Sequence, residues 1–324
     1  MRVLIAGATG AVGRQLVPQA LKAGHDVVAL SRSNRRVPAN WRIRHLAVDA
    51  LDRTALRDAV TDLRPDAVID LLTAIPQQVD PRRVSRDFAL TNRLRRDGTA
   101  NLIAAATEAG ATRYVGESIA FAYRPAEGLA GETDPLWGPE APREFRPVLE
   151  AVFAKEQAIE RFGGIALRLG HLCGPGTAFG GGGAMVAAVK AHKLPIVGDG
   201  GATFSFLPVE DAARAFLLAL QVDGPAVFNV VDDAPAKARE WISALAADLG
   251  AKQPIRVPAF LARPLIGAYG VMFMTRMRGA SNTAAKERLG WTPKQDWRTA
   301  MLRPPPSSPS QNGAGVAAPA AAVE

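Results

Sequence analysis

RVLIAGATGAVG, residues 2–13, is the stretch that decides the fold expected for this chain. Its apolar run at 3–6 is typical of a buried parallel strand. Directly after the glycines, apolar residues recur at helical spacing, beginning at Val12 and continuing at Leu16 and Ala20. The glycines therefore lie between a strand and a helix, which is the context in which such a triplet predicts a dinucleotide-binding turn.

Each glycine of this turn has its own physical role. Gly7 lets the chain turn sharply, Gly10 lets the backbone approach a pyrophosphate, and Gly13 lets the helix pack closely on the strand. The N–H groups at the start of the helix would face the phosphates, and the helix dipole favours negative charge there. A glycine turn without a ligand is the alternative, but its setting between strand and helix favours nucleotide binding.

The composition bounds the class of protein. The chain has 324 residues, 48% of them hydrophobic, which is enough for one large α/β unit or two domains that share a cleft. Its one cysteine, Cys173, excludes an intrachain disulfide and favours a reducing, cytoplasmic compartment. With no signal-peptide pattern and no run of about 18 apolar residues, we expect no membrane partner.

The net charge of +8 does not by itself indicate nucleic-acid binding. The densest basic segment, residues 82–96, contains acidic Asp87 and a single aromatic residue, Phe88, so it is typical of a solvated helix face. We expect no nucleic-acid partner, and an arginine-containing pocket for a phosphorylated cofactor explains part of the excess charge.

Strand and helix patterns alternate along the first half of the chain. Strands are predicted at 26–30, 43–48, 67–72, from 113, and at 165–169, and helices at 51–63, 86–109 and 148–162. This alternation predicts an α/β fold with a Rossmann-type doubly wound parallel sheet over residues 1–170. Residues 171–303 are expected to form a smaller substrate-binding region that also contributes to the sheet. The Pro-, Ser- and Ala-rich residues 304–324 are expected to be a disordered tail.

The end of the second predicted strand bears on cofactor choice. An acidic residue there selects NAD, whereas arginine accommodates the 2′-phosphate of NADP. This chain has Ser31, Arg32 and Ser33, followed by Arg35 and Arg36, and no acid among them. We therefore expect NADP, with NAD as the alternative if these residues form only a basic surface loop.

Several separated motifs resemble the extended branch of the short-chain dehydrogenase/reductase superfamily, the NAD-dependent epimerase/dehydratase-like proteins. They span residues 1–300: the glycine triplet, Asp49 after the third strand, Gly98-Thr99 with Asn101-Leu102, Arg168, Gly174-Pro175-Gly176, Phe206 to Asp211 and Leu289 to Pro293.

The resemblance implies a set of functional residues. Ser118 falls at the position of the family's substrate-binding serine and Lys155 at that of its catalytic, cofactor-holding lysine. Arg276 and Arg278 lie in a late region where a basic residue holds a substrate phosphate. The expected cofactor contacts are Gly7, Thr9, Gly10, Ala11, Val12, Gly13, Ser31, Arg32, Asp49, Ala50, Leu72, Thr73, Ala74 and Lys155.

One position departs from the family pattern. The family active site is Tyr-x-x-x-Lys, in which the tyrosine transfers a proton and the lysine lowers its pKa. The residue four before Lys155 is Ala151, which has no proton to give. Tyr123, in the loop after Ser118, is the best replacement acid, although a loop aromatic more often serves packing. His171 and Cys173 are too few ligands for a metal site.

These observations predict an NAD(P)(H)-dependent oxidoreductase of the extended, atypical type, acting on a small carbonyl or hydroxyl compound. Ser118 and Lys155 are compatible with this activity and also with a nucleotide-sugar epimerase or dehydratase. Ala151 is compatible with a non-catalytic dinucleotide-binding protein. The sequence does not identify the substrate, and it leaves a homodimer as an option.

Overall fold

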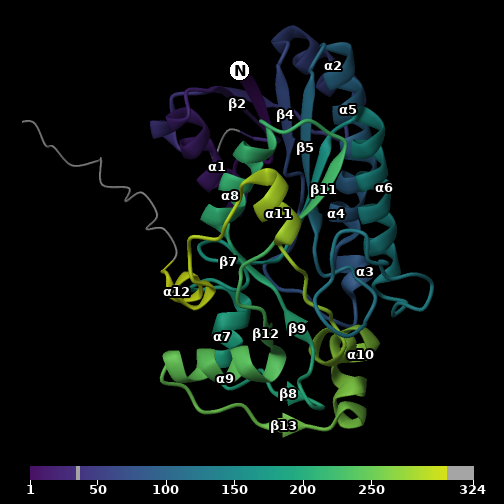
Figure 1. The fold of residues 1–324 in the computed structure, drawn as a ribbon, viewed down its shortest axis with the longest axis vertical. Coiled ribbons are helices and arrows are strands. Elements are labelled where there is room, and N and C mark those ends of the chain that lie inside the picture. The colour runs from purple at the N-terminus through teal and green to yellow at the C-terminus, as the bar shows by residue number, and fades with distance from the viewer. Residues whose placement is uncertain (34–36, 305–324) are drawn as a thin grey trace, which may run out of the picture.

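A seven-stranded sheet forms the centre of the protein (Figure 1). The computed structural model describes residues 1–33 and 37–304, and in that part all the neighbouring strands of this sheet are parallel. The order is β11-β6-β5-β4-β1-β2-β3, so the predicted doubly wound parallel sheet is confirmed. The strands are β1 (Arg2–Ala6), β2 (Asp26–Ser31), β3 (Arg44–Ala47), β4 (Ala67–Asp70), β5 (Arg113–Ile119), β6 (Ile165–Leu169) and β11 (Ala226–Val230).

Helices cover both faces of this sheet, and strand β1 shows how the sequence encodes the two layers. Val3 and Ile5 pack into one core cluster with α1 (Ala11–Lys22) and α8 (Val209–Ala219). Leu4 and Ala6 point the other way, into a cluster with α2 (Arg53–Leu63) and α5 (Thr99–Glu108). Because successive strand residues alternate between faces, a strand buried on both sides must be continuously apolar.

The predicted helix at 86–109 is a series of shorter elements. It comprises α3 (Val84–Asp87), α4 (Ala89–Arg93), a π-helical turn at Leu94–Gly98, and α5. The wider π turn leaves Arg95 buried at 2% exposure, where it contacts a carboxylate from β5. Helix α6 (Arg146–Phe162) follows the long irregular segment after β5 and packs on the same side as α5.

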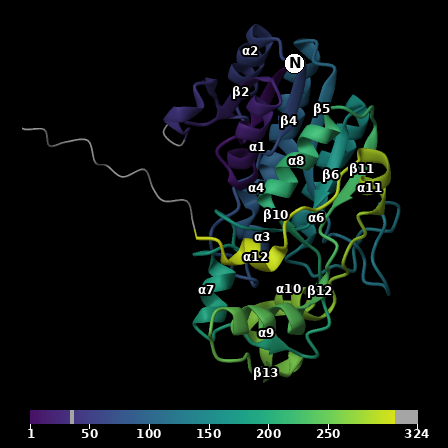
Figure 2. The same ribbon diagram turned by 60° about the vertical axis from the view of Figure 1, so that its left-hand side comes forward.

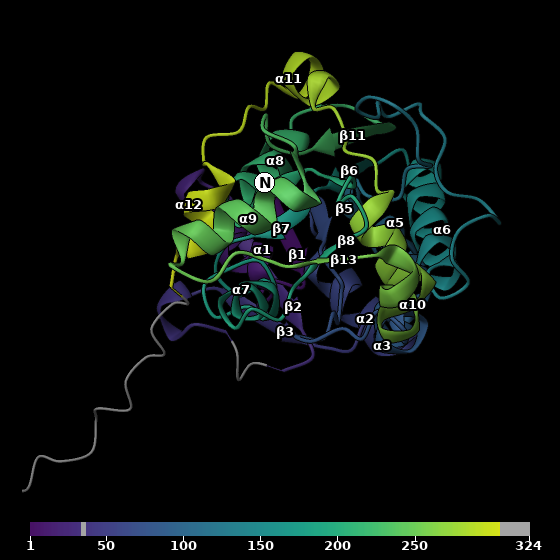
Figure 3. The same cartoon turned by 90° about the horizontal axis from the view of Figure 1, so that it is seen from below.

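Beyond the carboxyl ends of the strands lies a second group of elements with its own core (Figures 1 and 2). Its helices are α7 (Ala184–Lys190), α9 (Ala238–Asp248), α10 (Ala259–Thr275) and α12 (Trp297–Leu302). Its paired strands are β7 (His171–Cys173) with β10 (Phe206–Pro208), β8 (Ile196–Val197) with β13 (Arg256–Val257), and β9 (Thr203–Phe204) with β12 (Ala236–Lys237). The view in Figure 3 places α7, α9 and α10 in front of the sheet.

The chain crosses between these two halves more than once. After residue 170 it forms β7, and then returns to the sheet as α8 and β11, where α11 (Thr283–Leu289) also packs. A short 3-10 turn, Ala39–Trp41, completes the described elements. No helix within the described residues is both long and apolar enough to cross a membrane. Apart from Pro304, the expected tail lies outside the described residues.

Candidate functional site at the carboxyl edge of the sheet

The glycine turn after β1 requires glycine at its first position. Gly7 has φ of +85°, and a Cβ built there would lie 2.6 Å from the carbonyl oxygen of Leu71. The turn therefore lies directly against the residues that follow β4. Strands β1 and β4 are neighbours in the sheet although β2 and β3 lie between them in the sequence. In doubly wound folds, ligands bind at the carboxyl ends of two such strands.

The other two glycines, Gly10 and Gly13, lie at the start of α1. A Cβ at Gly13 would lie 2.5 Å from the carbonyl oxygen of Ala8, so a side chain there would push α1 away from β1. Gly10 caps α1 without a side-chain hydrogen bond, which leaves the N–H groups at Ala11 and Val12 available for phosphate oxygens. Gly176 approaches this helix start from the other half, where its Cβ would lie 3.7 Å from Ala11 Cβ.

The expected contacts for the adenosine half lie at the ends of β2 and β3. Ser31 Oγ donates to the carbonyl oxygen of Ser33 at 2.9 Å and lies 2.8 Å from His45 Nε2. Arg32 is exposed, whereas Arg35 and Arg36 lie outside the described residues. Asp49 is also exposed, and its carboxylate accepts from the Leu51 N–H at 3.0 Å.

Two helix side chains form hydrogen bonds to the loops that follow β3 and β4. Asn101 Nδ2 donates to the carbonyl oxygen of Ala50 at 3.0 Å, and Thr91 Oγ accepts from the Ala74 N–H at 3.1 Å. Between these loops Leu72 is buried and Thr73 is exposed. The residues expected to hold the cofactor are thus brought to one edge by β1, β2, β3 and β4.

Ser118 and Tyr123 are brought together, but inside the protein. Ser118 Oγ donates to Glu156, Glu156 pairs with Arg168 at 2.8 Å, and Arg168 donates to Tyr123 Oη at 2.8 Å. Tyr123 in turn donates to Asn229 at 2.6 Å and is 1% exposed. Burial raises the pKa of Tyr123, and the positive charge of Arg168 lowers it by a smaller amount. This network ties β5, β6, α6 and β11 together.

Lys155 belongs to a different buried cluster. Its ammonium group lies 3.2 Å from Asp70 and 3.1 Å from Glu117, and Arg95 pairs with the other Glu117 oxygen at 3.2 Å. Gly116 leaves room for Ile159 on the next turn of α6, since a Cβ there would lie 2.4 Å from Ile159 Cδ1. Two cations thus offset two anions at a site where Lys155 is 1% exposed.

The cations of this cluster keep Glu117 ionised. Burial disfavours the charged form of Glu117, but the neighbouring charges of Arg95 and Lys155 lower its pKa to about 2. Asp70 also accepts hydrogen bonds from Thr99, Tyr114 and the Leu72 N–H. The cluster therefore connects α6 to the chain that follows β4. Sequence reasoning missed Asp70, Glu117 and Arg95, although a charged residue within an apolar strand is a usable signal.

The first turns of α6 present apolar groups to the core of the second group of elements. Val148 and Val152, one turn apart, pack in the same core cluster as Ile119 at the end of β5. Ala151 is buried beside them. Helix α6 contains no tyrosine, so neither the turn before Lys155 nor the first turns of the helix carry the family's tyrosine.

A narrow crevice, too small to admit a water molecule, lies where β5 and β6 end. It is lined by Ala120, Phe121, Gly170, His171, Ser205 and Arg278. Ala120 and Gly170 directly follow the two strands, so the crevice lies at the carboxyl edge, beyond the cofactor strands. Of the two expected substrate-binding arginines, Arg278 lines this crevice, whereas Arg276 is exposed and does not.

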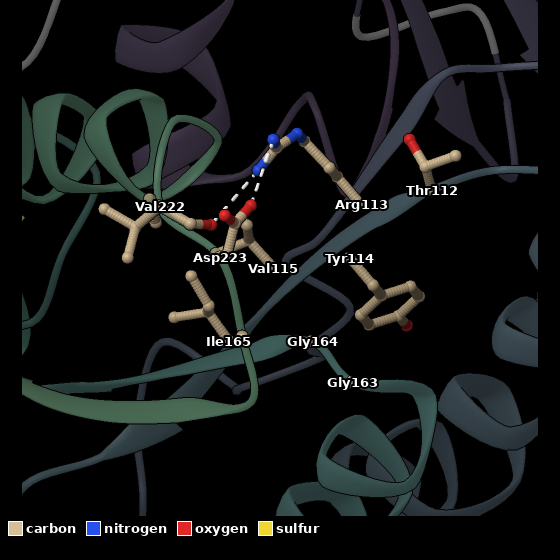
Figure 4. Close-up of a pocket in the computed structure, with 11 residues that line it drawn as sticks. Thr112, Arg113, Tyr114, Val115, Gly163, Gly164, Ile165, Val222 and Asp223 are labelled. Atoms are coloured by element: carbon tan, nitrogen blue, oxygen red, sulfur yellow. Dashed lines mark hydrogen bonds and ion pairs between the residues drawn. The ribbon is translucent and has the colours of Figure 1, made fainter.

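A larger cleft of about 240 Å³ lies at the opposite end of the sheet (Figure 4). It opens beside the amino ends of β5 and β6, where Arg113 donates to the carbonyl oxygen of Val222 and pairs with Asp223 at 3.3 Å. Because ligands of open parallel sheets bind at the carboxyl ends of strands, the chemistry is assigned to the other edge.

A family model described as the NAD dependent epimerase/dehydratase family matches residues 3–230. The chain belongs to this family. It is 39% identical to a 3-diazoavenalumate denitrifying reductase from a Streptomyces species, over 94% of this chain and 100% of that protein. It is also 27% identical to the dTDP-6-deoxy-L-talose 4-dehydrogenase (NAD(P)(+)) of Kitasatospora kifunensis, over 93% of both chains.

Solved structures show the same fold. UDP-glucose 4-epimerase from Thermotoga maritima with UDP-glucose superposes with a TM-score of 0.73 at 19% identity, covering 93% of this chain and 96% of that chain. The Thermus thermophilus UDP-glucose 4-epimerase complex with NAD gives 0.72 at 24% identity, with the same coverage. The chain is an NAD(P)-dependent enzyme of the extended short-chain dehydrogenase type, and its family acts on small molecules.

Proposed function

We propose that this enzyme is an NADPH-dependent reductase that replaces the diazonium group of a small organic substrate with hydrogen. Its 39% identical relative is named as a denitrifying reductase of a diazo compound and is covered along its full length. The observation that carries the proposal is the apolar face of α6. On the turns where the family's proton donor would lie, this helix has Val148, Ala151 and Val152.

The chemistry of the two candidate reactions differs in its need for a proton. Hydride addition to a carbonyl leaves an alkoxide, and a positioned acid that protonates it contributes about 10²–10⁴ in rate. A diazonium carbon that accepts a hydride loses its C–N bond, and N₂ leaves with the bonding electron pair. The balance is R–N₂⁺ + H⁻ → R–H + N₂, which consumes no proton. An active site without a proton donor is therefore suited to the second reaction.

The described residues fit a dinucleotide that supplies this hydride. The turn at Gly7 and the free N–H groups at the start of α1 would hold its pyrophosphate. Ser31 and Arg32 favour the 2′-phosphate of NADPH, since the described end of β2 carries no acid that would select NADH. We assign Lys155 a positioning role: through Asp70 it holds the Leu72 N–H and the loop after β4, beside the cofactor turn.

The proposal is tested with the purified full-length protein, benzenediazonium and benzaldehyde. We expect NADPH oxidation with the diazonium, one N₂ and one benzene formed per NADPH above an enzyme-free blank, and reduction of benzaldehyde at least about a hundredfold slower. Equal rates for the two compounds, or no enzyme-dependent N₂ release, would contradict the proposal. Reduction of NAD(P)⁺ with a dTDP-6-deoxyhexose would instead support the activity of the second relative.

A further inference from the structure

The segment that leads through β13 into the first half of α10 exposes four large apolar side chains. Ile255, Phe260, Leu261 and Leu265 are 59%, 73%, 54% and 71% exposed. Elsewhere in the described residues no large apolar side chain exceeds 51%. This end of the protein lies at the bottom of Figure 1. Apolar side chains that gather on one part of a surface indicate an interaction site.

The exposed residues of α10 share one face of the helix. They lie before Gly267, where φ of +71° interrupts the helix. At about 100° per residue, Phe260, Leu261 and Leu265 fall within about 140° of the helix circumference. Ala262, on the opposite side, is buried in the core of the second group of elements. The helix therefore buries one stripe and leaves a second apolar stripe uncovered.

Unpaired cations flank this uncovered stripe. Lys252, Arg256 and Arg263 are exposed, and none of them forms an ion pair within the part of the chain that the structure describes. Residues 252–279 contain five basic residues and neither Asp nor Glu. The apolar stripe thus lies in a positively charged surrounding.

The elements that pack against α10 leave this charge largely in place. The turn after β8 lies against the start of α10 and carries one exposed acid, Asp199. At the other end, the segment that lies against Gly267 includes Arg82, whose charge is paired with Asp80 at 3.0 Å. One acid therefore stands against three unpaired cations.

We propose that the uncovered stripe of α10 docks the protein on the surface of an anionic lipid bilayer. The apolar side chains enter the boundary between headgroups and acyl chains, and the three cations contact lipid phosphates. The expectation of no membrane partner was drawn from the lack of a spanning run, and docking on a surface needs none. The proposal is independent of the reaction that the enzyme catalyses.

A second copy of this chain is the other occupant to consider. A symmetric contact through the same stripe would bring two sets of unpaired cations together, and their repulsion opposes such a dimer. Anionic headgroups attract the same cations, so the charge favours lipid over a second copy.

Co-sedimentation of the purified full-length protein with vesicles tests the proposal at low salt. One vesicle contains equal parts of phosphatidylcholine and phosphatidylglycerol, and the other contains phosphatidylcholine alone. We expect partitioning onto the anionic vesicle to be at least about tenfold stronger, because each cation near such a surface adds about fivefold. Equal partitioning onto the two vesicles, or sedimentation with neither, would overturn the proposal.

A double variant tests the apolar stripe itself. Phe260→Ser with Leu265→Ser keeps every charge and should weaken partitioning onto the anionic vesicle at least about tenfold, since two buried apolar side chains are lost. The control, Leu21→Ser with Leu302→Ser, removes exposed apolar side chains elsewhere and should partition like the wild-type protein. Wild-type partitioning in the first variant would contradict the proposal.

A second double variant tests the charge, and serves if the serine variant folds poorly. Arg256→Glu with Arg263→Glu should abolish the preference for the anionic vesicle. The control is Arg53→Glu with Arg161→Glu, which changes exposed arginines of α2 and α6 and alters the net charge equally. This control should keep the preference. An equal loss in both variants would show that the charge of the whole protein, rather than this surface, attracts the lipid.

Sedimentation velocity without vesicles measures the alternative occupant. The wild-type protein and the Phe260→Ser with Leu265→Ser variant should have the same oligomeric state. A wild-type dimer that this variant dissociates, with no partitioning of the wild-type protein onto either vesicle, would assign the stripe to a second copy and overturn the proposal.

Discussion

The glycine turn at the start of α1 and the first turns of α6 lie at the same edge of the sheet, yet they preserve the family pattern to different degrees. At the glycine turn each expected glycine has a steric reason in the structure, from Gly7 against Leu71 to Gly13 against Ala8. Along α6, valine and alanine occupy the turns where the family places its acid. Under the proposed function, the glycine turn keeps the binding site for the hydride-donating cofactor, while α6 no longer provides a proton donor.

The largest effect on cofactor affinity is expected at the glycine turn. In Gly13→Val the side chain would collide with the carbonyl oxygens of Ala8 and Gly7, at 2.5 and 2.6 Å from Cβ. We expect NADPH affinity to fall at least about a hundredfold, about 2.7 kcal/mol, together with a loss of stability. Fluorescence titration of NADPH and thermal unfolding measure the two losses.

Gly24→Ala is the matched control at the other end of α1. Gly24 has φ of +80°, but no atom of the described residues lies within 4 Å of the place where a Cβ would stand. Alanine there costs only the backbone strain of about 1–2 kcal/mol. Its NADPH affinity should equal that of the wild-type protein. Unchanged affinity in Gly13→Val would remove the glycine turn from the cofactor site.

The second effect separates a positioning role of Lys155 from a cofactor contact. Lys155→Met leaves Asp70 and Glu117 with an uncompensated charge in the interior, which should cost about 3–5 kcal/mol of unfolding free energy. Urea unfolding measures this cost. A direct ribose contact would instead lower NADPH affinity while leaving stability unchanged.

Acid gives an independent readout of the same cluster. The folded-state pKa of Glu117 is about 2, below its usual 4.5, so ionised Glu117 stabilises the protein fully above about pH 4.5. That contribution is lost as the pH falls from about 4.5 towards 2. In Glu117→Gln this acid-dependent loss should be smaller. An identical acid profile in the variant would show that Glu117 is not held ionised by its partners.

The third effect concerns cofactor choice and is smaller. Arg32→Asp replaces a cation with the acid that accepts from a free ribose hydroxyl. We expect the ratio of NADPH to NADH affinity to fall by about ten- to a hundredfold, the value of a hydrogen bond to a charged phosphate. Titration with both cofactors measures it, and an unchanged ratio would make Arg32 a surface residue.

The smallest effect on turnover is expected at Tyr123. Its hydroxyl pairs with Asn229 and Arg168 inside the protein, so Tyr123→Phe should cost about 1–3 kcal/mol of stability. Diazonium reduction should stay within about twofold of wild type. A loss of the size that general acids supply, about 10²–10⁴, would identify Tyr123 as the missing proton donor.

The sequence predicts the parts of the molecule that depend on neighbours along the chain. The glycine turn and the parallel sheet follow from local spacing, because apolar runs and glycines encode strand, turn and helix within a few residues. The break of helix 86–109 into a π turn at Leu94–Gly98 was not predictable from spacing, and Arg95 of this turn pairs with Glu117 on a strand distant in sequence.

The substrate side depends on residues that meet only in three dimensions. Lys155 lies on helix α6 and carries no signal in the sequence that it will face Asp70, at the end of strand β4. The rings around His171 come from positions 121, 204 and 273, so the short His-x-Cys pattern alone predicts neither this group of rings nor the crevice beside it. Charge pairing and ring contacts between distant segments are set by packing of the whole fold.

The central claim, that the enzyme delivers a hydride without a partner proton, is tested most directly by isotope transfer. Benzenediazonium is reduced once with NADPH deuterated at the hydride position in ordinary water, and once with unlabelled NADPH in heavy water. The account predicts one deuterium per benzene in the first reaction and none at the reacting carbon in the second. Deuterium entering that carbon from the solvent would contradict it.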